Sequence, residues 1–402
     1  MRTMPFDFPS LISPLTPVGF FSEYWEKNHL HIQNRSNVHY DRLVSIEDID
    51  NFISRADTRY PAIRLAKAGA FYPKSTFTRD VRYGDEFFEG LPDVEKIFTE
   101  YCGGATITLP ALHLSCDPLG QLCAQMETEF DHIVNANAYI TPARAAGFTP
   151  HYDTHEVFVL QIAGKKHWHV FPPPIGLPHK TQVFSPEKYV HQNTPLLEVE
   201  LVAGDLLYLP RGYIHTTTTS DSFSAHITIG VTVYTWVELL SELLQTSVDN
   251  SQFRKALPIG FASQPEFQRQ LKARLAELVD ELCKTTDIDR LISAFMQRVK
   301  SAQPRKAARF HADMTAIGLT TPLKVIPRQR YEITVENDNV IVSVEGRRVQ
   351  LPNAVKQTLD AMCATNTFFP GKLPGRFGDE GKLALVRYLY GIGFLQTTGQ
   401  VG

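Results

Sequence analysis

The sequence contains only five cysteines, and none of them forms a CxxC pair. An odd number of cysteines at irregular spacing argues against a disulfide framework and against a zinc ribbon. We therefore expect reduced thiols and a cytoplasmic setting. No apolar run approaches the roughly 20 residues that a membrane helix needs, and the first residues lack the apolar core of a signal peptide. The protein is thus expected neither to span a membrane nor to be secreted.

An excess of charge of one sign is also lacking. The 402 residues carry a formal net charge of −3, which provides no global basic field for nucleic acid and none for an acidic membrane surface. Hydrophobic residues make up 43% and charged residues 21%, which excludes disordered and fibrous chains. The length allows two or three domains. Composition therefore predicts a globular protein and says nothing about its chemistry.

The pattern of residue types changes along the chain. Residues 1–100 are expected to form a mainly helical lead-in, with one helix beginning near Ser45. Residues 101–234 consist of short β-rich runs separated by Gly, Pro and Asp, which predicts a sandwich or barrel. Residues 235–304 carry two amphipathic helical stripes. Their apolar faces need a partner, which is either another part of the chain or a second subunit.

Residues 305–402 have the pattern of a small α+β domain. A hairpin is expected with its turn at Asn337, Asp338 and Asn339, followed by a helix around Val355–Cys363 and a further helix through Leu383–Leu389. Short helices with a β-hairpin suggest a winged-helix shape. The mild excess of Lys and Arg in this segment is typical of a solvated face, so direct nucleic-acid binding is not expected.

Histidines concentrate in the β-rich segment and indicate where its site lies. His151 and Asp153 are two residues apart, so in a strand both side chains point to the same face. His215 follows the turn-forming Pro210 and Gly212 and would complete a set of two histidines and one carboxylate. Such a set leaves coordination positions open and is typical of non-haem Fe(II) oxygenases. The alternative is that these residues are ordinary core or surface histidines.

Lys166 is the next informative residue. The strand before it is expected to end in a hairpin turn at Ala163–Lys165, which resets the alternation of side chains. On the returning strand Lys166 and Trp168 share one face, and a core position for Trp168 turns Lys166 inward. A buried cation is costly unless it meets an anion, which a dicarboxylate cosubstrate would supply. The alternative is a surface lysine whose aliphatic chain packs on Trp168.

The stretch from Asn135 to Phe171, which includes NANAYITP and HYDTHEVFVLQIAGKKHWHVF, resembles the JmjC-type ribosomal oxygenases, as do the later PRGYIH and HITIG. The resemblance extends over most of the chain. It implies an α+β fold with a double-stranded β-helix (cupin or JmjC) core, a helical dimerisation segment that forms a homodimer, and a C-terminal winged helix. It also implies a dioxygenase that uses Fe(II), 2-oxoglutarate and O2 to hydroxylate a His or Arg side chain of a ribosomal protein.

The resemblance also assigns roles to individual residues. His151, Asp153 and His215 match the metal ligands of the catalytic centre. Lys166 matches the basic residue that binds the C5 carboxylate of 2-oxoglutarate. Three further residues match positions that line the cosubstrate pocket: Asn137, Tyr139 and Thr228. His226 shares a strand face with the last of these and is expected nearby.

The chain departs from the family pattern directly after the His-x-Asp motif. Thr154 and His155 stand where the family commonly has an acidic and an apolar residue. His155 has the same strand phase as His151 and Asp153, which favours a place in the substrate pocket. The alternative is a histidine with only local structural contacts.

Two other functions remain open at this point. One is a 2-oxoglutarate oxygenase that acts on another peptide, such as the precursor of a natural product. The other is a non-catalytic cupin that binds a metal or ligand, against which Asp153 and Lys166 both argue. Demethylation of N-methyl-lysine is disfavoured because the C-terminal segment shows no chromatin-reading motif.

Overall fold

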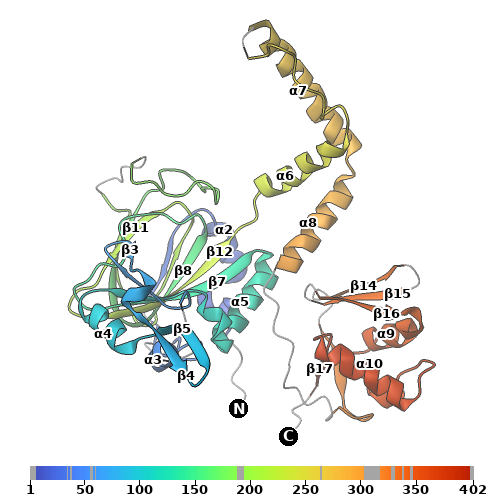
Figure 1. Ribbon diagram of the computed structural model, residues 1–402, viewed down its shortest axis with the longest axis horizontal. Coiled ribbons are helices and arrows are strands. Elements are labelled where there is room, and N and C mark those ends of the chain that lie inside the picture. The colour runs from blue at the N-terminus through green and yellow to red at the C-terminus, as the bar shows by residue number, and fades with distance from the viewer. Residues whose placement is uncertain are drawn as a thin grey trace. The chain divides into compact units, whose positions relative to one another are not determined.

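The computed structural model describes residues 6–33, 35–36, 39–54, 58, 60–187, 194–262, 265–302, 317–326, 331–336, 339–344 and 347–398. The chain forms two compact units, Met1–Leu240 (the first unit) and Ser241–Gly402 (the second unit), whose elements are labelled in Figure 1. Within the described ranges, no helix is long and apolar enough to cross a membrane.

The first unit opens with short helices: α1 (Phe8–Ile12), α2 (Pro17–Glu23) and α3 (Ile46–Ser54). At α3, the Ser45 hydroxyl accepts the N–H of Asp48 at 3.1 Å, and the Asp48 carboxylate accepts the N–H of Ser45 at 2.9 Å. This reciprocal capping satisfies two N–H groups that have no partner inside the helix. The helix start expected at Ser45 is therefore confirmed.

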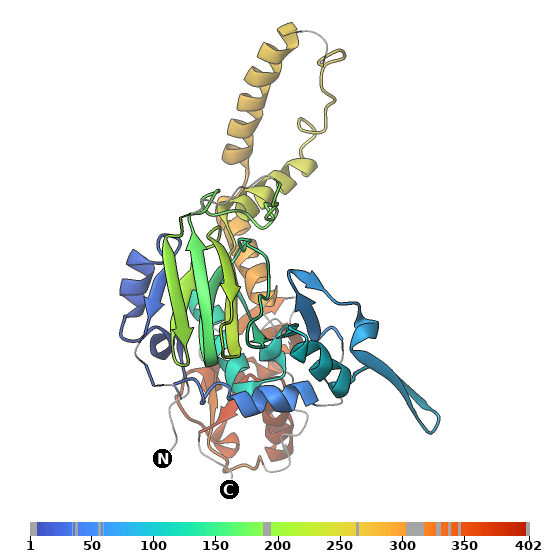
Figure 2. The same cartoon turned by 90° about the vertical axis from the view of Figure 1, so that its left-hand side faces the viewer.

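The lead-in also contains strands: β1 (Leu30–Ile32), β2 (Arg64–Lys67), β3 (Ala70–Phe71), β4 (Thr78–Tyr83) and β5 (Glu86–Pro92), before α4 (Val94–Cys102). The lead-in is therefore mixed, with strands beside the expected helices. β1 pairs with β10 and β2 with β6, and such distant partners are not visible in a local sequence pattern. β4 and β5 form a hairpin of their own, which extends away from the main sheet in Figure 2.

The main sheet lies in the predicted β-rich segment. Its strands there are β6 (Thr106–Leu109), β7 (Ile133–Thr141), β8 (Glu156–Phe171), β9 (Leu197–Val202), β10 (Leu206–Leu209), β11 (Ile214–Thr218) and β12 (Ser224–Thr232). The order is β1-β10-β8-β12-β7-β6-β2-β3, while β9 and β11 pair with the second half of β8. With α5 (Asp117–Phe130) packed against it, this body is a mixed, cupin-like architecture.

β8 is one strand of 16 residues, so the hairpin turn expected at Ala163–Lys165 is wrong. The first half pairs with β10 and β12, and the second half pairs with β9 and β11. Gly164 allows the bend between them, because its φ is +63° and a Cβ there would overlap the carbonyl oxygen of Phe223. The bend does shift the alternation by one residue, so Lys166 and Trp168 are buried as expected.

The two faces of β8 contribute to different apolar clusters. One face packs with the N-terminal helices in the larger cluster, to which β8 contributes Phe158, Leu160 and Ile162. The other face, called the inner face below, encloses a smaller cluster: Val157, Val159, Trp168, Val170, Leu201, Leu207 and Leu209. The polar side chains on this inner face are the candidates for chemistry, because each requires a partner or a ligand.

The second unit begins within α6 (Trp236–Thr246) and continues through α7 (Pro265–Thr285) and α8 (Ile288–Ala302), at the positions of the amphipathic stripes. Its C-terminal part contains β13 (Leu323–Val325), β14 (Tyr331–Glu336), β15 (Asn339–Val344), β16 (Arg347–Pro352), α9 (Lys356–Cys363), α10 (Asp379–Gly391) and β17 (Leu395–Thr397). β14, β15 and β16 form an antiparallel sheet, so the expected hairpin and both expected helices are confirmed. Asn337 and Asp338 of the expected turn lie outside the described residues.

Candidate metal and cosubstrate site

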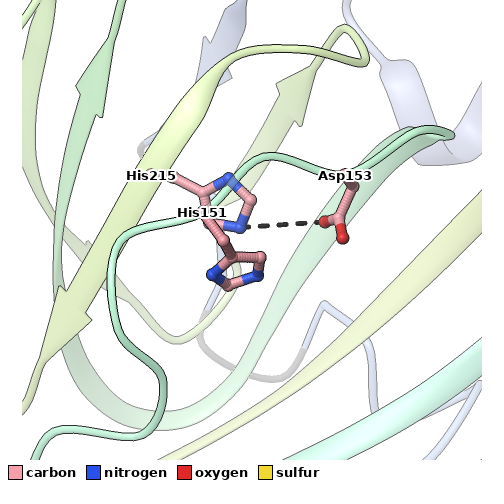
Figure 3. A group of neighbouring side chains, drawn as sticks. All are labelled: His151, Asp153 and His215. Carbon is pink, nitrogen blue, oxygen red and sulfur yellow. Dashed lines mark ion pairs between the residues drawn. The ribbon is translucent and has the colours of Figure 1, made fainter. Parts of the chain in front are cut away.

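The structure brings His151, Asp153 and His215 together, as Figure 3 shows. One nitrogen or oxygen of each side chain lies within 4.8 Å of those of the other two. Nε2 of His215 is 3.7 Å from Oδ2 of Asp153, and the two imidazole centroids are 4.5 Å apart. The backbone forces this meeting, because His151 and His215 exchange both N–H···O bonds as an antiparallel bridge.

Backbone carbonyls fix both imidazole rings. Nδ1 of His151 lies 2.8 Å from the carbonyl oxygen of Thr149, and Nδ1 of His215 lies 3.2 Å from that of Tyr213. Because a carbonyl oxygen can only accept, each Nδ1 carries the proton and each Nε2 keeps a free lone pair. Orientation of a histidine through its second nitrogen is the usual arrangement at metal sites. The donor set therefore fits a divalent metal ion.

The electrostatics keep these donors in the form that binds a metal. Burial lowers the pKa of His215 to about 4, with the neighbouring His151 acting in the same direction. Burial opposes ionisation of Asp153, but the adjacent His155, His215 and His151 outweigh it and lower the pKa of this carboxyl group. At neutral pH the site therefore offers a neutral imidazole and a carboxylate, which are the protonation states of metal ligands.

Lys166 is buried deeper in the first unit. Its ammonium group donates to Oγ1 of Thr141 at 3.1 Å, and Thr141 in turn lies 3.1 Å from Oγ1 of Thr106. In the described ranges no carboxylate forms an ion pair with Lys166, and burial lowers its pKa to about 7. A buried cation whose only partner is a hydroxyl group is energetically unfavourable, and an anionic ligand would supply the missing opposite charge.

The remaining predicted residues lie on the paired strands β7 and β12. Thr228 is directly opposite Asn137, and His226 is directly opposite Tyr139, with stacked rings 5.1 Å apart. Hydrogen bonds from Thr228 and Asn137 favour the phenolate of Tyr139, but burial dominates and raises its pKa to about 12. The side chain of Asn137 also accepts the N–H of Ala111 at 3.0 Å. All four side chains therefore line one region.

Trp168 connects the metal-ligand group to the surroundings of Lys166. Its ring stacks 5.7 Å from that of His215 and meets the ring of His226 edge-on at the same distance. Burial lowers the pKa of His226, and the charges of Lys166 and His215 lower it further. His226 is therefore neutral beside the lysine, which leaves Lys166 as the positive group at this end of the site.

His155 also lies on the inner face, close to β12. An ideal Cβ on Gly230 would be 2.8 Å from Cδ2 and 3.0 Å from Nε2 of His155. The same point is 3.2 Å from Oδ1 of Asn135 on β7. The strand phase therefore predicts the face of His155 correctly, whereas nothing in the sequence pattern indicates its closeness to Asn135 and Gly230.

Sequence reasoning missed a buried charge network at the start of β8. The Arg211 guanidinium donates to Glu156 at 2.7 Å and to Glu26 at 2.5 Å, and the Tyr208 hydroxyl donates to Glu156 at 2.5 Å. Arg211 lies in the turn that leads to His215, and Glu156 opens β8. Thr141 is a second omission, although the alternation along β7 places it on the same face as Asn137.

Comparison with known proteins places this fold and site in a class. The sequence matches the family described as JmjC domain over residues 112–239. The cupin-like body with two histidines and one aspartate on its inner face is thus a JmjC domain. E. coli ribosomal oxygenase YcfD has a related structure, with a TM-score of 0.48 and 15% identity over 95% of this chain and 98% of that chain. The YcfD complex with cobalt and 2-oxoglutarate gives a TM-score of 0.49 at 14% identity, over 96% of this chain and 99% of that one.

Sequence relatives narrow the class further. A Drosophila persimilis protein named bifunctional lysine-specific demethylase and histidyl-hydroxylase NO66 is 31% identical over 258 residues, which are 62% of this chain and 36% of the relative. Chicken ribosomal oxygenase 1 is 29% identical over 73% of this chain and 50% of its own length. Mouse ribosomal oxygenase 2 is 29% identical over 68% of this chain and 60% of its own length. The chain is thus similar to the JmjC-type ribosomal oxygenases, although it spans only about a third of the Drosophila relative and half of the chicken one.

Proposed function

We propose that this protein is an Fe(II)- and 2-oxoglutarate-dependent dioxygenase that hydroxylates a His or Arg side chain of a ribosomal protein. The observation that supports it most is the pairing of two features on one inner face. One is a group of two histidines and an aspartate with oriented Nε2 atoms. The other is a buried lysine without an anionic partner among the described residues. The relatives named ribosomal oxygenases supply the substrate class.

His151, Asp153 and His215 would hold Fe(II), since two imidazoles and one carboxylate are the usual ligands of this metal in oxygenases. When bound, the iron supplies the O2 chemistry of the reaction. The protein's own residues hold the ligands in place and keep water out of the inner face. Trp168 contributes to both tasks, because its buried ring stacks against His215 and fills the space toward His226.

Lys166 would bind the C5 carboxylate of 2-oxoglutarate, with Thr141 orienting its ammonium group. Asn137, Tyr139 and Thr228 would line the same pocket. Their hydroxyl and amide groups offer donors to a carboxylate or keto oxygen, and the Tyr139 hydroxyl remains protonated because its pKa is raised.

Replacing Lys166 with methionine should raise the KM for 2-oxoglutarate by at least about 30-fold, because a buried charge-assisted hydrogen bond is lost while the volume is kept. The matched control is Lys165→Met. Lys165 is the preceding residue on β8, and its side chain is 52% exposed on the opposite face. Succinate formation at varied 2-oxoglutarate measures both variants. Equal KM values in Lys166→Met and wild type would remove Lys166 from the cosubstrate site.

The KM for 2-oxoglutarate should rise with pH above 7. Burial lowers the pKa of Lys166 to about 7, so the ammonium form that attracts a carboxylate is fully present below this pH and is lost above it. The rise should approach tenfold per pH unit well above pH 7. KM values measured between pH 6 and 9 test this, and Lys166→Met should lose the dependence. A flat profile in the wild type would contradict the assignment.

The substrate class is tested by intact-mass spectrometry of proteins extracted from purified ribosomes. These are incubated with the enzyme, Fe(II), ascorbate and 2-oxoglutarate, and the His151→Ala variant serves as the blank. A single ribosomal protein that gains the mass of one oxygen only with active enzyme is the expected result. Conversion of 2-oxoglutarate to succinate without any such shift would redirect the search to other peptides. Absence of both would favour a non-catalytic cupin.

We further propose that residues 235–304 form a dimerisation segment, which makes the protein a homodimer. Large apolar side chains of this segment are exposed in the single chain: Leu240, Leu244, Leu275, Val279, Ile288, Ile292 and Met296. Exposed apolar surface on this scale is typical of protein interfaces. Sedimentation of the purified protein as a monomer at micromolar concentration would remove this proposal.

We also propose the other domain limits: a lead-in over residues 1–100, a JmjC core over 101–234 and a winged helix over 305–402. The antiparallel sheet of β14, β15 and β16 beside α9 and α10 has the elements of a winged helix. We propose no contact of this domain with nucleic acid. The five cysteines are free thiols, which supports a cytoplasmic setting.

A further inference from the structure

Two polar side chains on the inner face, His155 and Asn135, lie close against a glycine of β12. Gly230 on β12 lies opposite Asn135 of β7 and Val157 of β8. Its backbone does not require glycine, since its φ lies outside the left-handed region. Its neighbours do require it, because a Cβ would be 2.8 Å from the ring of His155 and 3.2 Å from Oδ1 of Asn135. The missing side chain therefore makes room for these two polar groups.

His155 and Asn135 both present polar atoms without a partner. In the part of the chain that the structure describes, neither the His155 ring nor the Asn135 amide makes a hydrogen bond, and both side chains are only half-buried. His155 is close enough to Asp153 to act on the charge of that carboxylate. It is nevertheless outside the group whose donor atoms lie within 4.8 Å of one another. It is thus beside the metal ligands without being one of them.

The position along the strands separates Asn135 from the lysine end of the cosubstrate pocket. Lys166 contacts Thr141 at one end of β7, and Asn135 lies six residues nearer the other end. At about 3.3 Å per residue, this is a separation of about 20 Å. A five-carbon dicarboxylate anchored at Lys166 is much shorter than this. The polar groups of His155 and Asn135 are therefore left for the other reactant.

We propose that His155 and Asn135 together bind the polar end of the substrate side chain, and that Gly230 lets both polar groups take up this position. This inference rests on the proposed function. An imidazole nitrogen that either donates or accepts, next to an amide, matches the N–H and nitrogen groups of a His or Arg side chain. Buried hydrogen bonds of this kind discriminate strongly against side chains that lack them. His155 and Asn135 are in this sense specificity-determining residues.

The test compares four variants with the proteins of purified ribosomes as the substrate mixture. His155→Leu removes the hydrogen bonds, His155→Gln keeps one, and Gly230→Ala adds a methyl group that displaces the ring. His167→Leu is the control, since this side chain lies on the outer face of β8, the strand that begins directly after His155, and is 39% exposed. Oxygen addition and succinate are measured while the mixture and 2-oxoglutarate are varied separately.

We expect His155→Leu and Gly230→Ala to raise the half-saturating concentration of the mixture by about tenfold, as the loss of one hydrogen bond predicts. The KM for 2-oxoglutarate should change less than twofold in both. His155→Gln should recover most of the loss, and His167→Leu should match the wild type. A higher half-saturating concentration with an unchanged KM for 2-oxoglutarate, together with the recovery in His155→Gln, distinguishes substrate binding from a merely structural role.

Two results would overturn the inference alone: an unchanged half-saturating concentration in His155→Leu, or a parallel rise in the KM for 2-oxoglutarate. Both require a wild type that modifies a ribosomal protein. A wild type that converts 2-oxoglutarate but modifies none of these proteins would overturn the proposed substrate, and this inference with it.

Discussion

Conversion of 2-oxoglutarate to succinate by the His151→Ala variant should fall below about 1% of the wild-type rate, because a metal ligand is lost. Even the loss of a residue that only orients a metal ligand usually lowers metal affinity or activity about 10- to 100-fold. Iron content after anaerobic loading should fall in parallel. The reason is geometric: the Nε2 atom that Thr149 orients is removed, and the two remaining donors, Asp153 and His215, are too few to hold the metal firmly. Succinate analysis and elemental analysis of the loaded protein measure the two effects.

His169→Ala is the matched control for this variant. His169 lies on the outer face of β8, its side chain is 32% exposed, and its nearest charged partner is Glu198 at 3.3 Å. We expect its iron content and turnover to equal those of the wild type. Full iron occupancy together with full turnover in His151→Ala would show that the metal is held elsewhere.

The second large effect concerns the buried charge network of Arg211, Glu156 and Tyr208. Arg211→Met should lower the free energy of unfolding of the first unit by about 3–5 kcal/mol, because it leaves the fully buried Glu156 carboxylate without its cation. Urea unfolding followed by tryptophan fluorescence measures this unit selectively. All three tryptophans of the chain, Trp25, Trp168 and Trp236, belong to the first unit.

The pH dependence of this loss has a definite sign. Burial already raises the pKa of Glu156 in spite of Tyr208 and Arg211, and removal of Arg211 raises it further. When the pKa of a carboxyl group is higher in the folded than in the unfolded state, the free energy of unfolding falls as the pH rises above the pKa of the unfolded state. The deficit of Arg211→Met should therefore be smaller at pH 5 than at pH 8.

The control for Arg211→Met is Arg144→Met, which breaks an ion pair with Asp221 whose two side chains are 80% and 84% exposed. Exposed pairs of this kind contribute about 0–1 kcal/mol. An equal loss in the free energy of unfolding in the two variants would show that the buried network stabilises the protein no more than an exposed ion pair does. A double variant, Arg211→Met with Glu156→Met, should recover part of the loss because no unpaired charge remains.

The metal-ligand group was within reach of sequence reasoning because its signals are local. His151 and Asp153 share a face by strand alternation, and the turn before His215 is marked by proline and glycine. The inward position of Lys166 was also predictable from Trp168. The reason offered for it, a hairpin turn, was wrong, since the bend at Gly164 depends on the carbonyl of Phe223, which no pattern around residue 164 reveals.

What sequence reasoning missed depends on distant partners. Arg211 lies 185 residues from Glu26 and 55 residues from Glu156 along the chain, so neither contact has a periodicity that indicates it. β1 and β2 are strands because β10 and β6 pair with them. Likewise, only the assembled sheet shows that His155 and Asn135 lie close together beside Gly230.

The continuity of β8 has a consequence for how the first unit opens. One strand supplies hydrogen bonds to β10 and β12 with its first half and to β9 and β11 with its second half. Because both halves of the sheet share this strand, we expect them to open together. Amide protons on either side of Gly164 should accordingly exchange with solvent in one cooperative event at the same free energy. The spacing between the metal ligands and Lys166 is thus held for as long as the whole unit remains folded.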